Sequence, residues 1–209
     1  HGAIGSSQQF DFLKSELSTD LDVFTFNFPG HGGEPIPEES FSIKLFSQSV
    51  LEFLDANDLD KVSIFGYSMG GYVGMYLAKH FPERIEKLIT LATKFHWDET
   101  TAEKEVQMLN PEKIEAKIPS FAAELKKRHE PVDWKDVLNS TKNFILEMGK
   151  NNPLKPDDYR SITIPVLIML GDKDKMVTLE ETVNVYKLLP HSQFGVMPNT
   201  VHPIESVNV

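Results

Sequence analysis

The hydrophobic positions of this chain follow two spacings, and each spacing is typical of one kind of element. Short runs of apolar and β-branched residues predict buried strands, and they occur at residues 21–28, 62–65, 88–92, 164–170 and 194–197. Apolar residues at helical spacing predict helices over residues 8–17, 41–56, 72–80 and 178–189. Because strands and helices alternate, we expect an α/β fold with a mostly parallel central sheet and helices on both faces.

Residues 97–160 interrupt this alternation. The segment is charged, carries no strand signal and is punctuated by prolines, so it predicts short helices over residues 98–109, 118–128, 134–148 and 156–160. It is too long for a single crossover between two strands. We therefore interpret residues 97–160 as an inserted helical cap on a core formed by residues 1–96 and 161–209, with extra helices packed beside the sheet as the alternative.

A serine stands where one predicted strand meets the helix that follows it. The sequence Gly66-Tyr67-Ser68-Met69-Gly70 has the spacing Gly-x-Ser-x-Gly, and Gly71 follows directly. A strand that turns at once into a helix brings the two backbones so close that only glycine fits beside the serine. The serine then projects at the positive end of the helix. An ordinary turn is the alternative, but the strand, the extra glycine and the helix favour Ser68 as a nucleophile.

A nucleophilic serine needs a base within hydrogen-bond reach, and the base needs an orienting carboxylate. In a parallel α/β sheet, functional residues gather in the loops after the carboxyl ends of the strands. Asp172 and Asp174 follow one predicted strand, and His202 follows the last one. Each residue alone is typical of a turn or a surface. Their order after Ser68 predicts a triad made of Ser68, one of the two aspartates and His202.

The first seven residues are a candidate for the loop that would stabilise the negative oxygen in such a site. His1–Ser7 is rich in small residues, and glycines let backbone N–H groups approach a substrate oxygen. A flexible terminus is the alternative to this oxyanion-loop interpretation. His31, in the turn Pro29–Gly33, is interpreted as a structural residue of the turn rather than as a base.

The composition fits a globular domain and narrows the function. The chain has 209 residues, of which 40% are hydrophobic and 25% charged, which fits one domain with an insertion. A net charge of −10 argues against nucleic acid and anionic membrane surfaces, and we interpret the basic run Lys126–Arg128 as one solvated helix face. No apolar run approaches the ~20 residues of a membrane helix.

The lack of cysteine excludes disulfides, thiolate catalysis and cysteine-based zinc sites. It is also typical of a cytoplasmic protein. The chain begins without methionine, so secretion behind a signal peptide stays an alternative to that location.

With these residues in place, the chain resembles the α/β-hydrolase superfamily. The resemblance rests on His1-Gly2, on the turn Phe28-Pro29-Gly30-His31-Gly32, on the elbow around Ser68, on Gly171-Asp172-Lys173-Asp174 and on His202. It covers essentially the whole chain except the predicted cap. It implies that Asp174 rather than Asp172 is the acid, and that the backbone N–H groups of Ala3 and Met69 form the oxyanion hole.

The triad and the resemblance together predict a serine hydrolase that cleaves a carboxylic ester or related acyl compound through an acyl-enzyme on Ser68. We expect a small-molecule acyl substrate, no metal and no organic cofactor, and we make no prediction of the oligomeric state. The candidate pocket residues, each with a plain core role as its alternative, are Ile4, Tyr67, Phe95, Trp97 and Met176.

Several other activities stay open, because the fold and triad do not determine the substrate. Within enzymes these are a C–C bond hydrolase, a thioesterase, a lipase, a peptidase and a cofactor-free haloperoxidase or perhydrolase. From a different class, a non-catalytic ligand-binding protein of the same fold is the alternative.

Overall fold

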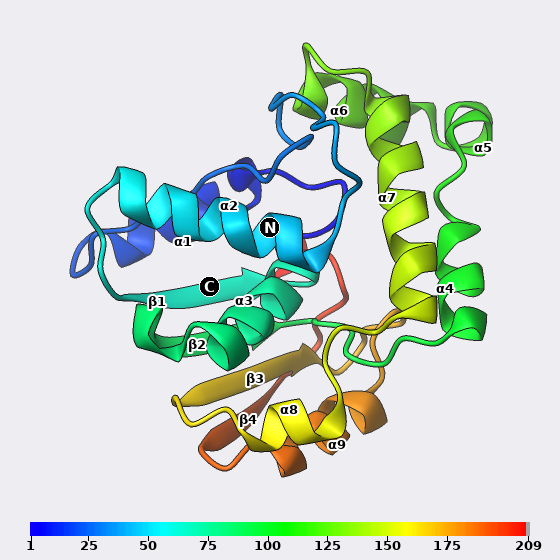
Figure 1. The fold of residues 1–209 in the computed structure, drawn as a ribbon. Helices are drawn as coiled ribbons and strands as arrows, with labels where there is room; N and C mark the ends of the chain where they lie inside the picture. Colours follow the sequence, from blue (N-terminus) through cyan, green and yellow to red (C-terminus); the bar gives the residue numbers. More distant parts are fainter. Residues whose placement is uncertain (208–209) are drawn as a thin grey trace. The chain divides into compact units, whose positions relative to one another are not determined.

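The computed structural model describes residues 1–207. The described chain forms two compact units, each assembled from two separate segments (Figure 1). One unit, here called the sheet unit, consists of Ile43–His96 and residues 152–207. The other, here called the helical unit, consists of His1–Ser42 and Trp97–Asn151. The predicted division into a core and a cap at residues 97–160 stays a prediction.

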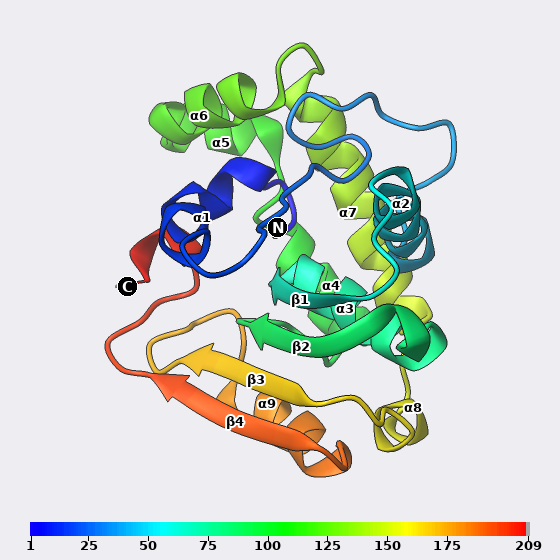
Figure 2. The same cartoon turned by 90° about the vertical axis from the view of Figure 1, so that its left-hand side faces the viewer.

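The sheet unit is built on a four-stranded parallel sheet. Its strands are β1 (Val62–Tyr67), β2 (Ile85–Leu91), β3 (Val166–Gly171) and β4 (Ser192–Met197), and they lie side by side in that order (Figure 2). The helices of this unit are α2 (Ile43–Ala56), α3 (Met69–His80), α8 (Pro156–Arg160) and α9 (Leu179–Leu188), with 3-10 turns at Pro82–Arg84 and Ile204–Ser206. The predicted α/β class with a parallel central sheet flanked by helices is confirmed.

Close packing of helices on this sheet explains which residues form it. Helix α3 lies against β1 and β2, and α9 lies against β3 and β4. Leu88 of β2 stands between Ile64 of β1 and Val166 of β3, and it is 1% exposed. Helix α3 approaches this row so closely that a Cβ at Gly74 would meet Leu88 Cδ1 at 2.6 Å. A continuous apolar run is what a strand needs when helices bury it in this way.

The parallel register brings the carboxyl ends of all four strands to one edge. Tyr67 pairs with Leu91, Leu91 with Met169, and Gly171 with Met197. The loops that follow β1, β3 and β4 therefore begin at the same edge of the sheet. These are the loops that carry the predicted triad residues.

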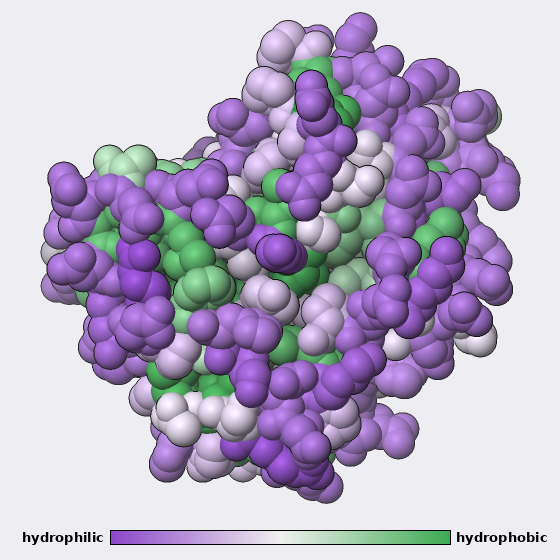
Figure 3. Space-filling view, in the orientation of Figure 1, coloured by the Kyte–Doolittle hydropathy of each residue, from purple (hydrophilic) through white to green (hydrophobic). Residues whose placement is uncertain are grey.

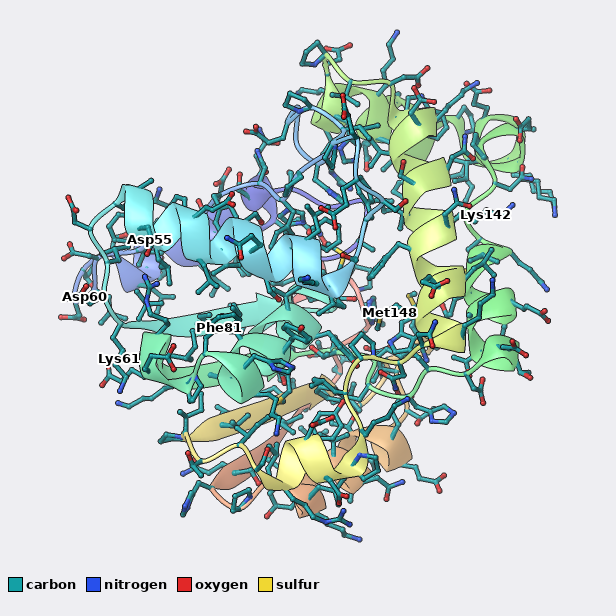
Figure 4. All side chains as sticks on the ribbon, in the orientation of Figure 1. Asp55, Asp60, Lys61, Phe81, Lys142 and Met148 are labelled. Carbon is teal, nitrogen blue, oxygen red and sulfur yellow. The ribbon has the colours of Figure 1, made fainter. Side chains whose placement is uncertain are left out.

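The helical unit holds a 3-10 turn (Ser7–Phe10) and the helices α1 (Asp11–Leu17), α4 (Glu99–Val106), α5 (Pro111–Lys117), α6 (Pro119–His129) and α7 (Trp134–Lys150). Side chains of Asp98, Asn110 and Asp133 cap the starts of α4, α5 and α7 by accepting backbone N–H groups of the first turn. Helix α7 packs against α4 and α6. It is amphipathic, since Met148 is buried while Lys142, on the same helix, is exposed (Figure 4).

One predicted strand is wrong, and one helix was not predicted. Residues 21–28 are not a strand, and none of the strands among the described residues pairs with them. Side-chain bonds hold the end of this segment instead: Phe28 N–H donates to His1 Nε2, and Asn27 Oδ1 accepts the N–H of Ser7. Helix α5 was not predicted, although its Asn110 cap and its Pro111 start are helix signals in themselves.

The surface seen in Figure 3 is predominantly hydrophilic. Within residues 1–207, no helix combines the length and the apolar character needed to cross a membrane.

Candidate active site

Ser68 occupies a sharp and strained turn between β1 and α3. Its backbone has φ 51° and ψ −115°, a combination that a non-glycine residue rarely adopts. Its N–H donates to the carbonyl oxygen of Leu91 at 2.9 Å, and its own carbonyl oxygen accepts the N–H of Gly71 at 3.0 Å. Strain of this kind persists only where the surroundings hold it in place, and it is concentrated at functional sites.

Two glycines make this turn possible. A Cβ at Gly66 would meet the carbonyl oxygen of Gly70 at 2.5 Å, and a Cβ at Gly71 would meet Thr93 Oγ1 at 2.0 Å. Both distances are far below van der Waals contact, so the strand and helix approach each other only because side chains are missing there. Met69 is the first residue of α3, where a backbone N–H has no acceptor within its own helix. The serine thus sits at the positive end of a helix.

Asp174 and His202 form a hydrogen-bonded pair in the loops after β3 and β4. His202 Nδ1 lies 2.7 Å from Asp174 Oδ2, and the carboxylate side chain is fully buried. The other carboxylate oxygen, Oδ1, accepts the N–H groups of Met176 at 2.8 Å and Val177 at 2.9 Å. An ionised carboxylate only accepts, so Nδ1 of His202 carries the proton and Nε2 is left as the acceptor.

The charge state of Asp174 follows from these contacts. Burial by itself raises the pKa of Asp174, but the hydrogen bonds from His202 and from the Val177 N–H outweigh burial and hold the pKa below its ordinary value. Asp172 is placed differently. It is exposed, and its Oδ1 accepts the N–H of Thr200 at 3.0 Å. Of the two candidate aspartates, Asp174 is therefore the one in contact with His202.

The imidazole of His202 lies beside the elbow. Its ring centroid is 5.6 Å from that of Tyr67, the residue directly before Ser68. Tyr67 is 5% exposed, so its ring provides a buried surface for the imidazole. The structure thus brings His202 together with Asp174 on one side and with the last residue of β1 on the other.

The other pocket candidates of the sheet unit have different surroundings. Phe95 is 3% exposed, and its ring packs edge-on against Tyr159 with centroids 6.0 Å apart, which fits the core role that was its alternative. Its N–H donates to Glu181 Oε1 at 3.2 Å. Met176 is 36% exposed, and its contribution to the site is the backbone N–H that holds Asp174.

Three of the predicted site residues belong to the helical unit: Ala3, Ile4 and Trp97. Gly2, Ala3, Ile4 and Gly5 form a turn closed by the Gly5 N–H donating to the Gly2 carbonyl at 3.1 Å. The side chain of Ile4 packs against a buried cluster of Ile114, Leu125, Trp134 and Leu138. Trp97 is partly buried at the start of the segment that leads into α4.

The predicted structural role of His31 fits its environment. The ring is fully buried, its Nδ1 lies 3.0 Å from the Pro29 carbonyl oxygen, and burial lowers the pKa of His31 to about 3. Within the part of the chain that the structure describes, no three His, Cys, Asp or Glu side chains are grouped as metal ligands would be.

Comparison with known proteins identifies the family. The model of the alpha/beta hydrolase fold family matches residues 1–110, which is more than half of the chain. This protein belongs to the alpha/beta hydrolase fold family. The resemblance seen in the sequence is thereby confirmed for the family.

Two curated relatives are similar to this chain over most of its length. A protein of Bacillus subtilis (strain 168) named "Putative 2-succinyl-6-hydroxy-2,4-cyclohexadiene-1-carboxylate synthase" is 26% identical over 98% of this chain and 82% of its own length. The 3-oxoadipate enol-lactonase 2 of Acinetobacter baylyi (strain ATCC 33305 / BD413 / ADP1) is 25% identical over 84% of this chain and 70% of its own. The two names denote different reactions, a carboxylate synthase and an enol-lactonase.

Solved structures share the fold. A thermophilic esterase from Thermogutta terrifontis superposes with a TM-score of 0.78 at 21% identity, over 98% of this chain and 82% of that one. The enol-lactonase from Burkholderia xenovorans LB400 gives 0.76 at 17% identity, over 99% and 83%. At such identities the likeness supports the fold alone.

Proposed function

We propose that this protein is a serine hydrolase that cleaves a carboxylic ester or a related acyl compound through an acyl-enzyme on Ser68. The observation that carries the proposal is the pair formed by Asp174 and His202, which fixes the proton on Nδ1 and leaves Nε2 as a base. The imidazole ring of His202 lies against Tyr67, and the next residue, Ser68, is held in a strained turn. In nucleophilic catalysis, a buried aspartate that is hydrogen-bonded to a histidine orients that histidine as the base.

The proposed reaction has two halves. In the first, Nε2 of His202 takes the proton of the Ser68 hydroxyl as Oγ attacks the carbonyl carbon, and the leaving alcohol then receives that proton as the C–O bond breaks. In the second, water gives a proton to Nε2 as its oxygen attacks the carbonyl carbon of the acyl-enzyme. Nε2 then returns that proton to Ser68 Oγ as the bond between Oγ and the acyl carbon breaks, which releases the acid and regenerates the serine. Asp174 stabilises the imidazolium that forms in both halves and keeps the ring oriented.

The negative oxygen of each tetrahedral intermediate needs hydrogen-bond donors. The Met69 N–H is suited to this task, because it lies at the amino end of α3 directly after the nucleophile. Ala3 N–H, the other donor predicted from the sequence, belongs to the helical unit. Loss of one such donor typically lowers kcat by about 10²–10³-fold.

A serine-directed probe tests the proposal. A fluorophosphonate should add to the protein once, as seen by intact mass spectrometry, and the adduct should disappear in Ser68→Ala. Ser63→Ala is the matched control, since Ser63 is an exposed serine of β1, the strand that leads into the turn at Ser68, and this variant should be labelled like the wild type.

Turnover of p-nitrophenyl esters of graded acyl length would then show the preferred substrate class. Absence of an adduct on the folded wild type, together with no ester turnover, would refute the hydrolase proposal. That result would favour the non-catalytic binding protein.

A further inference from the structure

Glu181, in the first turn of α9, binds more than the start of its own helix. Its Oε2 accepts the N–H of Thr178 at 3.1 Å, which is one half of the capping box of α9. Its Oε1 accepts the N–H groups of Phe95 at 3.2 Å and His96 at 3.4 Å, in the loop after β2. Lys94 Nζ lies 3.6 Å from Oε2. A capping box needs none of the contacts with this loop.

These contacts are shielded from water. The side chains of Glu181 and Lys94 are only 11% and 14% exposed. Salt screens such a partly buried pair much less than an exposed one, and hydrogen bonds to an ionised acceptor are the strong ones. All the residues involved belong to the sheet unit, so the contact lies within one compact unit.

The loop after β2, residues 92–96, supports the turn that carries the serine. The carbonyl oxygen of Leu91, at the end of β2, accepts the N–H of Ser68 at 2.9 Å. The buried side chain of Thr93 fills the space that a Cβ at Gly71 would need. Between them Ala92 has φ 54°, which is uncommon for a residue other than glycine. A strained backbone persists only where its surroundings hold it, so this loop needs an anchor.

The other side of the Glu181 contact leads to the acid of the proposed triad. Asp174 Oδ1 accepts the N–H of Val177 at 2.9 Å, and Asp174 Oδ2 lies 2.7 Å from His202 Nδ1. Thr178, whose N–H is bound by Glu181, is the residue directly after Val177. The carboxylate of Glu181 is therefore one residue away from the segment that fixes Asp174, here called the acid loop (residues 172–177).

We propose that Glu181 is a positioning residue that joins the loop after β2 to the acid loop, and so keeps Asp174 and His202 aligned with the turn at Ser68. The inference rests on the proposed function, since this alignment matters for turnover only if Ser68 is the nucleophile. It deepens that function by giving a residue of α9, outside the triad, a share in the geometry of the site.

The physical reason is what the loop after β2 would do without this anchor. The peptide between Leu91 and Ala92 is fixed on both sides, because its carbonyl oxygen binds Ser68 and its N–H donates to the Met169 carbonyl oxygen at 3.0 Å. If Ala92 returned to a negative φ, this peptide would stay in place and the residues after it would move. The first of them is Thr93, whose side chain packs beside the turn at Ser68.

The acid loop would loosen at the same time. Without Glu181, the N–H of Thr178 loses its acceptor directly after the residue whose N–H holds Asp174. A displacement of catalytic groups by about 1 Å can lower the rate by about 10²-fold. Such a displacement weakens binding of the transition state more than binding of the substrate, so kcat should respond and KM should not.

Four variants separate the positioning role from the capping role. Glu181→Ala removes every contact of the carboxylate, whereas Glu181→Gln keeps one carbonyl oxygen, which can serve the helix cap or the loop after β2 but not both. Thr178→Ala is the matched control for capping, because it removes the cap hydroxyl of the same helix and keeps the N–H that Glu181 binds. Glu180→Gln, at an exposed position of the same turn, is the control for charge.

We expect Glu181→Ala to lower kcat on a p-nitrophenyl ester by about tenfold to a hundredfold, and Glu181→Gln by about fivefold to twentyfold, with KM changed by less than about twofold. Thr178→Ala should lower the urea midpoint but keep kcat within about threefold of the wild type, as should Glu180→Gln. If Glu181→Ala does not fold, Glu181→Gln supplies the comparison. A kcat that falls equally in the Glu181 variants and in Thr178→Ala, or that falls in none of them, would overturn the inference.

Hydrogen exchange separates this inference from the proposed function. The amides of Ser68 and Val177 should exchange faster in the Glu181 variants than in Thr178→Ala, measured relative to amides in the centre of β3, which report global unfolding. If the wild type neither turns over esters nor labels at Ser68, the proposed function fails while the exchange result still judges the link between the two loops. Exchange at both amides that matches Thr178→Ala overturns the inference whatever the activity.

Discussion

Replacing Asp174 by asparagine should nearly abolish activity while leaving the fold intact. The carboxylate accepts three hydrogen bonds, one from His202 and two from the backbone N–H groups of Met176 and Val177. In Asp174→Asn, those two N–H groups keep the single remaining carbonyl oxygen facing them. The new NH2 group must then face His202 Nδ1 and donate to it. That ring nitrogen becomes an acceptor, and the proton moves to Nε2.

The magnitude follows from this change of tautomer. An imidazole that carries its proton on Nε2 has no lone pair there to accept the proton of Ser68. In triads of this kind the exchange lowers kcat by about 10³–10⁴-fold, which corresponds to about 4–5.5 kcal/mol of transition-state stabilisation. KM should change little, because Asp174 is buried behind the histidine and faces away from substrate.

The assay is the hydrolysis of a p-nitrophenyl ester at several pH values, with the urea unfolding midpoint as a check on folding. Asp172→Asn is the matched control, since Asp172 is exposed and bonds to Thr200 rather than to His202. It should keep activity within about threefold of the wild type. Retention of more than about a tenth of the activity in Asp174→Asn, with a normal unfolding midpoint, would refute the tautomer argument.

Three further predictions concern stability. Gly71→Ala should lower the free energy of unfolding by about 1–3 kcal/mol, because its Cβ would meet Thr93 Oγ1 at 2.0 Å; urea titration measures this, and adding Thr93→Ala should recover part of the loss. The free energy of unfolding should fall as pH drops from about 6.5 to 5, because these histidines bind protons in the unfolded chain while buried His31 and His129 stay neutral in the folded one. The slope should be up to about 1.4 kcal/mol per pH unit for each ring. A free energy of unfolding that does not change with pH would contradict the neutral state of the two buried rings. Glu181→Gln should lower the free energy of unfolding by about 1–2 kcal/mol in the same urea titration, because it weakens the capping box of α9 and the ion pair between Glu181 Oε2 and Lys94 Nζ at 3.6 Å. An unchanged urea midpoint would show that this ion pair contributes nothing to stability.

Local signals were enough to predict most of the elements. Helix α8 begins with Pro156 and ends at Arg160 as expected, and α9 starts behind the Thr178 cap with Glu181 completing a capping box. A strand depends on more than its own residues, because it needs a partner for its backbone groups. Residues 21–28 have the composition of a strand, yet composition could not show that His1 and other side chains would satisfy the end of this segment.

The site residues that directly follow strands of the sheet could be predicted from the sequence. Contacts between segments that lie far apart in the sequence could not. The order of residues favoured a serine, an aspartate and a histidine at one sheet edge, but it did not choose between Asp172 and Asp174. That choice depends on the turn whose N–H groups hold Asp174. Arg128 was interpreted as part of a solvated helix face, whereas its guanidinium binds the Ile4 carbonyl. Nothing in a helix sequence indicates which loop will lie against its last turn.

Ser68 and Ile4 both have a strained backbone, with φ 51° and 52°, but they are held by different means, and the difference has a functional consequence. Ser68 is held by backbone contacts that need only glycine at two nearby positions and one bond to Leu91, so its geometry is encoded locally and carries no titratable group. Ile4 is held by an arginine and a neutral histidine from far along the chain. A substitution in α6 should therefore loosen the turn at residues 2–5 and leave the backbone of the elbow, and with it the position of the nucleophile, unchanged.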